Sequence, residues 1–265
     1  MKRRVFRLAA MADLHCKVAS GGSFKEIFSH IGEDSDALVL CGDLIDCGLP
    51  EEAEILLKEL SDLLRKIPVV AVFGNHEFEC GKIDVVRKIF TDGGITILDG
   101  DACEIDGVGF AGVKGFCGGF GERVLEPWGE SIIKQFVRQA IDEALKLESA
   151  LARLRTDQRV ALLHYAPIAA TVVGEPPEIF PFLGCSRLEE PLNRYPVTAV
   201  IHGHAHRGSP EGRTSNGVPV YNVAMRLLES AAQTRRPYRI LELPVSQRTS
   251  ITAAYTPDID QKAIR

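Results

Sequence analysis

The stretch VIHGHAH, residues 200–206, sets the expected fold of this chain. It continues an apolar segment that runs from Val197 to Ile201, which predicts a buried strand. A glycine turn after a strand carries the next side chains off the end of a sheet, so His204 and His206 can point into one small volume. Imidazole is the commonest protein ligand for transition metals. The stretch therefore indicates a metal site, although a short histidine-rich run can also be an incidental surface feature.

Four earlier segments share this organisation, an apolar strand followed at once by polar side chains that can bind a metal. The predicted strands are residues 5–12, 36–41, 68–73 and 159–163. They run into Asp13-Leu14-His15, Gly42-Asp43, Gly74-Asn75-His76-Glu77 and His164, in that order. Because ligands bind beyond the carboxyl ends of parallel strands, we expect these side chains to converge at one edge of the fold.

Helices alternate with the first three strands. Residues 24–31 are predicted to form a helix with Ser23 as its N-cap. Pro50 opens a second helix that runs to about Lys66, with apolar residues at three- and four-residue spacing. This alternation indicates βαβ units, and hence a parallel sheet covered by helices.

The remaining segments complete a single predicted domain of 265 residues. They are a helix at 83–90, strands at 95–98, 102–105 and 108–113, a helix at 188–195, strands at 218–224, 238–243 and 250–255, and a loose tail at 256–265. Asp106-Gly107 between two of these strands predicts a two-residue hairpin. A long helix is predicted from Pro127 or Ser131 to about Arg155, and its apolar stripe packs either on the sheet or against a second copy in a homodimer.

The composition is that of a globular protein, with 45 % apolar residues and a net charge of −5. This charge gives no basic face for general nucleic-acid binding. No segment reaches the roughly 18 apolar residues of a membrane span, and the apolar run after Arg7 is too short for a secretion signal. The seven cysteines are scattered without a Cys-x-x-Cys pair, which favours reduced thiols and a cytoplasmic location.

The candidate ligands combine imidazole nitrogen with carboxylate oxygen. Such a set suits Mn, Fe, Zn, Co or Ni better than Mg or Ca. Seven candidates exceed what one ion needs and fit two divalent ions that share a bridging carboxylate. Taken singly, Asp13, Asp43 and Asn75 could be turn residues, and His164 could be a structural histidine. The glycine-rich segment 115–121 lacks the Gly-Lys-Ser/Thr of a P-loop, so that alternative is rejected.

The ordered motifs D-x-H, G-D, G-N-H-E, H and G-H-x-H together resemble those of the calcineurin-like metallophosphoesterases. The resemblance implies an α/β fold, a four-layer αββα sandwich of two mixed β-sheets flanked by helices. It also implies ligands for one ion (Asp13, His15 and His206), ligands for the other (Asn75, His164 and His204), and a bridge between them (Asp43). His76 resembles the histidine of the family that approaches the scissile phosphate without binding metal. Glu77 stands where many members have aspartate and is expected to orient His76.

The expected reaction is hydrolysis of a phosphate ester by a hydroxide that bridges two divalent ions, for which manganese is the expected metal. His76 is expected to act as general acid and transition-state stabiliser. A phosphodiesterase is favoured over a phosphomonoesterase, a protein phosphatase or a nuclease, and a non-catalytic scaffold is the alternative from another class. The expected partner is a small phosphate ester or a nucleotide, chosen by the loops 116–128 and 167–184. Asp46 is expected to be a local cap or to support a ligand, His202 to be a strand residue, and His30 to lie on a helix surface.

Overall fold

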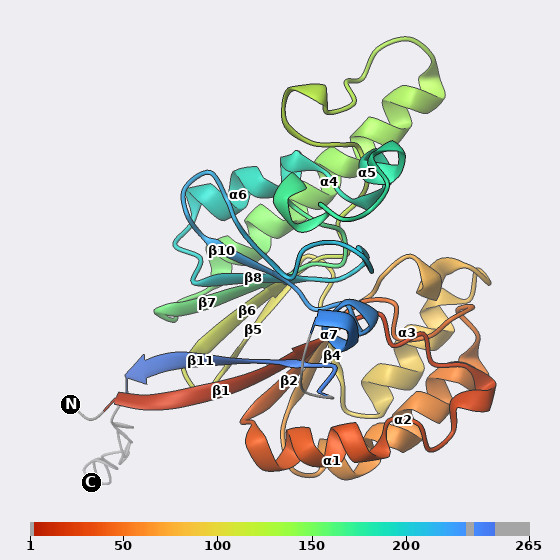
Figure 1. Cartoon of the computed structure of the whole chain (residues 1–265), viewed down its shortest axis with the longest axis vertical. Coiled ribbons are helices and arrows are strands. Elements are labelled where there is room, and N and C mark those ends of the chain that lie inside the picture. Colours follow the sequence, from red (N-terminus) through yellow and green to blue (C-terminus); the bar gives the residue numbers. More distant parts are fainter. Residues whose placement is uncertain (1–2, 232–235, 247–265) are drawn as a thin grey trace, which may run out of the picture.

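The computed structural model describes residues 3–231 and 236–246 of the chain. Two mixed β-sheets lie face to face, and helices cover the outer face of each sheet (Figure 1). This is the four-layer αββα sandwich that the family resemblance implies, so the predicted fold class is confirmed. The predicted strand at 250–255 and the tail at 256–265 lie outside the described residues.

The first sheet has the strand order β11-β1-β2-β3-β4. Its strands are β1 (Arg3–Met11), β2 (Ala37–Cys41), β3 (Val69–Val72), β4 (Thr96–Ile97) and β11 (Arg239–Ser246). The first four run parallel, and β11 pairs antiparallel with β1. The helices on its outer face are α1 (Lys25–Asp34), α2 (Pro50–Leu64) and α3 (Ile83–Asp92). The predicted βαβ units therefore form as expected.

The second sheet has the order β5-β6-β7-β8-β10-β9. Its strands are β5 (Asp101–Ile105), β6 (Val108–Gly112), β7 (Gln158–Leu162), β8 (Ala199–His202), β9 (Glu211–Arg213) and β10 (Pro219–Asn222). Asp106 and Gly107 join β5 to β6 with φ of 49° and 87°. Positive φ at both positions is the geometry of the predicted two-residue hairpin.

Helices α4 (Ser131–Arg153) and α6 (Glu189–Arg194) cover the second sheet. The sequence did not predict the short elements β9, α5 (Phe180–Leu183) and α7 (Met225–Ala231). None of them is long enough to show an apolar period. No helix within the described ranges is both long and apolar enough to cross a membrane.

The core follows the two-residue period of the strands. On β1, Leu8 and Ala10 face the space between the two sheets, where they join Phe110 and Leu162 of the second sheet. The intervening residues of β1 face the layer of α1, α2 and α3. Because both faces of each central strand are covered, the strands read as continuous apolar runs. This burial fixes where each strand ends, and so where the polar loops begin.

The predicted N-cap of α1 was wrong. The N-cap position is Phe24 instead of Ser23, and no side chain caps the helix. The reason is a buried carboxylate from α2: Glu59 accepts the backbone N–H groups of Gly22 at 2.7 Å and Phe24 at 3.2 Å. The donors ahead of the helix therefore have a partner other than the serine hydroxyl.

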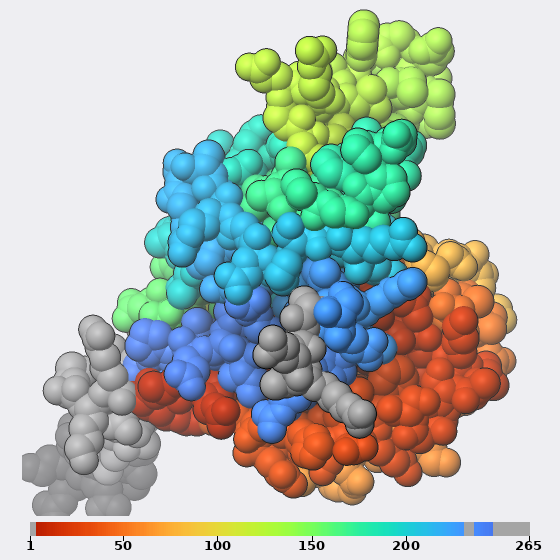
Figure 2. Space-filling view, viewed as in Figure 1, coloured from red at the N-terminus to blue at the C-terminus, as the bar shows by residue number. Residues whose placement is uncertain are grey.

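The long helix α4 starts at Ser131, the later of the two predicted positions, and only part of its apolar stripe is buried. Leu147 and Leu151 pack against the second sheet, and Val137 is buried. Ile132 is 66 % exposed and Leu145 is 52 % exposed. Figure 2 shows the yellow-green segment, which includes the start of α4, extending from the body of the molecule.

Candidate metal centre

The loops that follow β1, β2, β3, β7 and β8 meet at one edge of the sandwich. The backbone N–H of Asp13 donates to the carbonyl of Gly42 at 3.0 Å, which joins the first two loops. The N–H of Gly203 donates to the carbonyl of His164 at 3.2 Å, which joins the last two. Across the sheets, the N–H of His204 donates to Asp13 Oδ2 at 2.9 Å. The structure therefore brings the predicted site residues together.

The backbone at this edge is strained. Five non-glycine residues within the described ranges have a positive φ, and four of them are predicted ligands: Asp13 (58°), His15 (44°), Asp43 (48°) and His204 (69°). Such conformations cost about 1 kcal/mol or more each and persist where the surrounding structure enforces them, often at functional sites. The strain points to the same residues as the sequence motifs.

The glycines of the motifs make room for the ligands. A Cβ at Gly42 would collide with the ring of His164, and one at Gly74 would collide with Asp43. A Cβ at Gly203 would collide with the carboxylate of Asp13. Each glycine thus permits a close approach of backbone to a side chain from another loop.

One cluster contains Asp13, His15 and His206. The Nε2 atom of His206 lies 3.0 Å from Asp13 Oδ1 and 3.5 Å from His15 Nε2. The other nitrogen of His15, Nδ1, lies 3.3 Å from Oδ1 of Asp46. A proton on His15 Nδ1 would be held by that carboxylate, which leaves the Nε2 lone pair facing the cluster.

A second cluster surrounds His164. Its Nε2 atom lies 3.0 Å from Asn75 Oδ1, 3.1 Å from His204 Nδ1 and 3.4 Å from Asp43 Oδ2. Backbone carbonyls hold the opposite nitrogens: His164 Nδ1 is 3.0 Å from Cys41 O, and His204 Nε2 is 3.2 Å from Phe182 O. In the tautomers that these carbonyls favour, four lone-pair donors face one point with no proton between them. Such a set fits a bound cation.

Asp43 lies between the two clusters. Its Oδ2 atom is 3.4 Å from His164 Nε2 and 3.9 Å from His15 Nε2. Its Oδ1 atom accepts the backbone N–H of His76 at 2.9 Å, which fixes the carboxylate. The geometry therefore fits two cations that share one carboxylate, and the donor types suit transition metals.

Burial and neighbouring charges both shift the pKa values of the site residues. Without metal, burial alone would lower the pKa of His164, but the Asp43 carboxylate outweighs it and raises this pKa to about 9, so a cation bound here would displace the Nε2 proton. Burial would raise the pKa of Asp43, and His164 instead holds it far below its ordinary value. Burial lowers the pKa of His204 to about 4, which keeps this ring neutral. The hydrogen bond to Asp13 raises the pKa of His206.

His76 stands beside both clusters and forms a third group with His15 and Asp43, whose possible ligand atoms lie within 4.8 Å of one another. Its Nε2 atom is 3.9 Å from Asp43 Oδ2, and its ring meets that of His15 edge-on at 4.6 Å between centroids. Its Nδ1 contacts the carbonyl of Asp46. Burial would lower the pKa of His76, but that carbonyl and the nearby carboxylates raise it. The side chain of His76 is 27 % exposed, and its raised pKa favours the protonated form of the ring.

Glu77 does not make the expected contact with His76. In the described part of the chain, its carboxylate accepts four backbone N–H groups, those of Asp43, Leu44, Ile45 and Gly74, at 2.6 to 3.2 Å. Burial, and then the nearby Asp43 carboxylate, raise the pKa of Glu77 to about 7. Glu77 therefore joins the loop after β2 to the loop after β3. The residue that accepts the backbone N–H of His76 is Asp43.

Replacing Glu77 with alanine should destabilise the whole protein. Four buried N–H groups would lose their acceptor, and each such loss costs about 1–3 kcal/mol where water cannot replace it. We expect the free energy of unfolding in urea to fall by at least about 3 kcal/mol. Glu54→Ala, at an exposed position of α2, is the matched control. Equal stability of the two variants would contradict this role of Glu77.

Other residues fall outside the two clusters. His202 is fully buried, with Nε2 2.8 Å from Thr171 Oγ1, and burial lowers its pKa to about 4, so it is a neutral structural histidine. His30 is exposed on α1. The carbonyls of Cys41 and Phe182 were missed from the sequence. A backbone carbonyl carries no residue-specific pattern, so no sequence feature identifies them.

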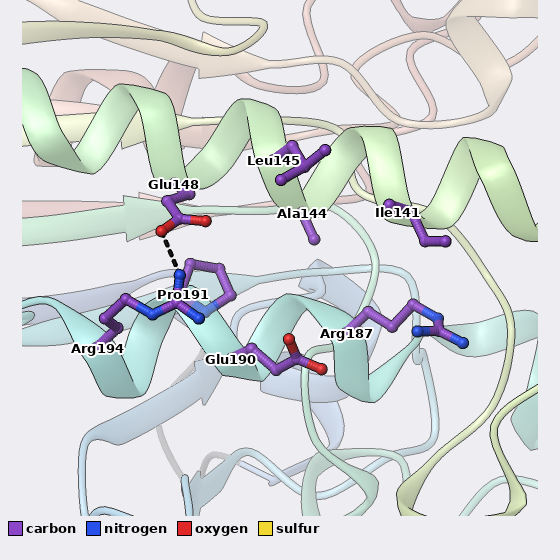
Figure 3. Close-up of a pocket in the computed structure, with 8 residues that line it drawn as sticks. All are labelled: Ile141, Ala144, Leu145, Glu148, Arg187, Glu190, Pro191 and Arg194. Atoms are coloured by element: carbon purple, nitrogen blue, oxygen red, sulfur yellow. Dashed lines mark hydrogen bonds and ion pairs between the residues drawn. The ribbon is translucent and has the colours of Figure 1, made fainter.

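A hollow lies elsewhere, between α4 and the α6 region, and Figure 3 shows it. Its walls combine Ile141 and Leu145 of α4 with Arg187 and Glu190, and an ion pair joins Arg194 to Glu148. None of the predicted metal ligands lines it. This hollow is therefore separate from the metal centre.

Comparisons with known proteins identify the family of this chain. A sequence model of the family described as calcineurin-like phosphoesterase matches residues 6–208. The chain is 22 % identical over 245 residues to a UDP-2,3-diacylglucosamine hydrolase of Salmonella arizonae, covering 81 % of this chain and 88 % of that relative.

Solved structures share the fold. A phosphopantetheinyl hydrolase from Mycobacterium tuberculosis superposes with a TM-score of 0.61 at 15 % identity, covering 89 % of this chain and 96 % of the other. A putative 5′-nucleotidase from Staphylococcus aureus gives a TM-score of 0.55 at 14 % identity, covering 84 % of this chain and 49 % of the other. At these identities the likeness establishes the architecture alone.

Proposed function

This chain belongs to the calcineurin-like phosphoesterase family, and we propose that it is a phosphodiesterase that binds two divalent metal ions where its two sheets meet. Membership of the family and its hydrolase relative make it a phosphoric ester hydrolase. The identity of the metal, the preference for diesters and the role of each residue form the proposal.

The observation that carries the proposal is the placement of Asp43 Oδ2. This single oxygen lies within 4 Å of a histidine nitrogen from each of the two clusters. Asp13, His15 and His206 would hold one ion, and Asn75, His164 and His204 the other. With Asp43 shared, each ion would have four protein ligands, which would leave coordination positions for water and substrate.

Two divalent ions, when bound, supply Lewis-acid stabilisation of the phosphoryl oxygens and lower the pKa of water enough to provide a nucleophile near neutral pH. The chain positions the remaining groups. His76, whose pKa is raised by the Asp46 carbonyl and nearby carboxylates, would in its protonated form hydrogen-bond a phosphoryl oxygen or donate its Nε2 proton to the leaving oxygen. The carbonyls of Cys41 and Phe182 keep the other histidines in their binding tautomers.

Diester hydrolysis is favoured over monoester hydrolysis by the relative, which is named a hydrolase of UDP-2,3-diacylglucosamine. We propose manganese as the ion that the mixed imidazole and carboxylate donors accept in both positions. The substrate would be a phosphate-ester small molecule or nucleotide.

Removal and return of metal tests the proposal on two substrates. We expect a chelator to abolish hydrolysis of bis(p-nitrophenyl) phosphate and Mn²⁺ to restore it, with kcat/KM for the diester at least about tenfold above that for p-nitrophenyl phosphate. The measurement is p-nitrophenol release, alongside metal content by mass spectrometry. A rate that survives chelation would exclude the metal mechanism. A preference for the monoester would make the protein a phosphomonoesterase, and a metal-loaded protein inert to both compounds would indicate a scaffold.

A further inference from the structure

A lysine outside the ligand set lies in a cage of aromatic rings. The ammonium of Lys114 is 5.0 Å from the ring centroid of Phe116, 5.1 Å from that of Tyr165 and 5.5 Å from that of Phe78. These distances are those of cation–π contacts. Phe78 is 42 % exposed, so the cage is open to solvent on that side.

The cage is part of the wall of the metal centre. The ring of Tyr165 lies 4.6 Å from that of His204 and 5.4 Å from that of His164, and Phe78 follows His76 by two residues. The ammonium of Lys114 is therefore within about 10 Å of the ring of His204. A second phosphate beside one bound at the metal centre could therefore reach this ammonium.

The backbone of Lys114 is fixed to the site. Its carbonyl accepts the N–H groups of both His164 and Tyr165, at 3.0 and 3.1 Å. The next residue, Gly115, has φ of 77°, and its N–H donates to the buried carboxylate of Glu143 at 2.9 Å. The loop after β6 that carries Lys114 is thus hydrogen-bonded to the loop after β7 that presents His164.

The charge of Lys114 lacks a carboxylate partner. Glu143, the nearest candidate on α4, pairs with Lys146 at 2.8 Å. Among residues 3–231 and 236–246, no carboxylate lies within 4.0 Å of the Lys114 ammonium, and its one hydrogen bond goes to the carbonyl of Gly115 at 3.2 Å. An ammonium has three donors, so two remain for a ligand.

We propose that Lys114 is a specificity-determining residue that binds a second phosphate of the substrate, next to the scissile one, so that the preferred substrates are organic diphosphates. The inference rests on the proposed phosphodiesterase function and narrows its substrate class. A compact ammonium suits a phosphate oxygen, with which it would form a charge-assisted hydrogen bond. Removing such a bond should weaken binding of the second phosphate by about tenfold or more.

The test compares two inhibitors that differ by one phosphate, P1,P2-dimethyl diphosphate and dimethyl phosphate. Their inhibition constants are measured against bis(p-nitrophenyl) phosphate with manganese-loaded protein. We expect the wild type to bind the diphosphate about tenfold more tightly than the monophosphate, and Lys114→Met to lose that preference. Lys134→Met, at an exposed position of α4, is the matched control and should keep it.

Each other outcome overturns the inference. A wild type without the preference excludes diphosphates as the substrate class, and an equal preference in wild type and Lys114→Met excludes the lysine. A purely structural cation would weaken both inhibitors together and lower the melting temperature, while their ratio stayed constant. A wild type that is metal-loaded but does not hydrolyse bis(p-nitrophenyl) phosphate would instead refute the proposed function itself.

Discussion

Asp43→Asn should empty both metal positions together. The substitution removes the negative charge that two cations would share, and its amide nitrogen has no lone pair for a metal. One Asp43 oxygen already accepts the His76 N–H at 2.9 Å, so the amide group would face His15 and His164. We expect the affinity for each ion to fall by more than about 100-fold. Loss of a residue that only hydrogen-bonds to a metal ligand lowers metal affinity by about 10–100-fold, and loss of the ligand itself should lower it further.

Metal content per chain, measured after dialysis against submicromolar Mn²⁺, checks this result. Asp62→Asn, an exposed substitution at 81 % side-chain exposure, controls for a change of one charge. Loss of one ion with retention of the other would contradict a bridging role. Full retention of both ions would remove Asp43 from the metal centre. Circular dichroism shows whether the variant keeps its fold while it loses the ions.

The architecture was predictable because burial leaves a strong periodic pattern. The central strands β2 and β3 of the first sheet are apolar on both faces, and α2 carries leucines at three- and four-residue spacing. These patterns require no knowledge of distant contacts. The short edge strand β9 and helix α5 lack any such period, because their positions depend on neighbours far along the chain.

The candidate ligands were predictable for a different reason. Histidine, aspartate and asparagine at strand ends are chemically specific residue types, and their convergence follows from the strand order. Their supports were not predictable. The carbonyls of Cys41 and Phe182 act through the backbone, which every residue has. The contact expected between Glu77 and His76 was replaced by a set of bonds to backbone N–H groups that no side-chain pattern encodes.

Several buried glutamates of this fold accept hydrogen bonds from backbone N–H groups of loops. Glu59 and Glu52 of α2 accept backbone N–H groups of the loops that precede α1 and α2, Glu143 of α4 accepts that of Gly115, and Glu77 ties the metal-binding loops together. In sequence, a glutamate on a helix is read as part of the exposed face. Here each one satisfies backbone groups in a loop, which stabilises loops that would otherwise bury unpaired donors.

His76→Ala should leave both metal ions bound and slow turnover by about 10²- to 10⁴-fold, the range for a positioned acid or base. Its Nε2 atom is 3.9 Å from Asp43 Oδ2, as is that of the candidate ligand His15, but the family resemblance places His76 outside the ligand set, so we expect its loss to leave the ions bound. His30→Ala, on the exposed face of α1, is the matched control. An unchanged kcat would exclude His76 from catalysis, and a loss of metal would place it among the ligands.

The leaving group separates two roles for His76. If His76 donates a proton to the leaving oxygen, its removal should slow an alkyl or phenyl diester far more than a p-nitrophenyl diester, because p-nitrophenolate departs without protonation. If it only stabilises charge on the phosphoryl oxygens, both substrates should slow by the same factor. The raised pKa of His76, caused by the Asp46 carbonyl and nearby carboxylates against the effect of burial, favours the proton donor. We therefore expect the slowing to increase with the pKa of the leaving alcohol.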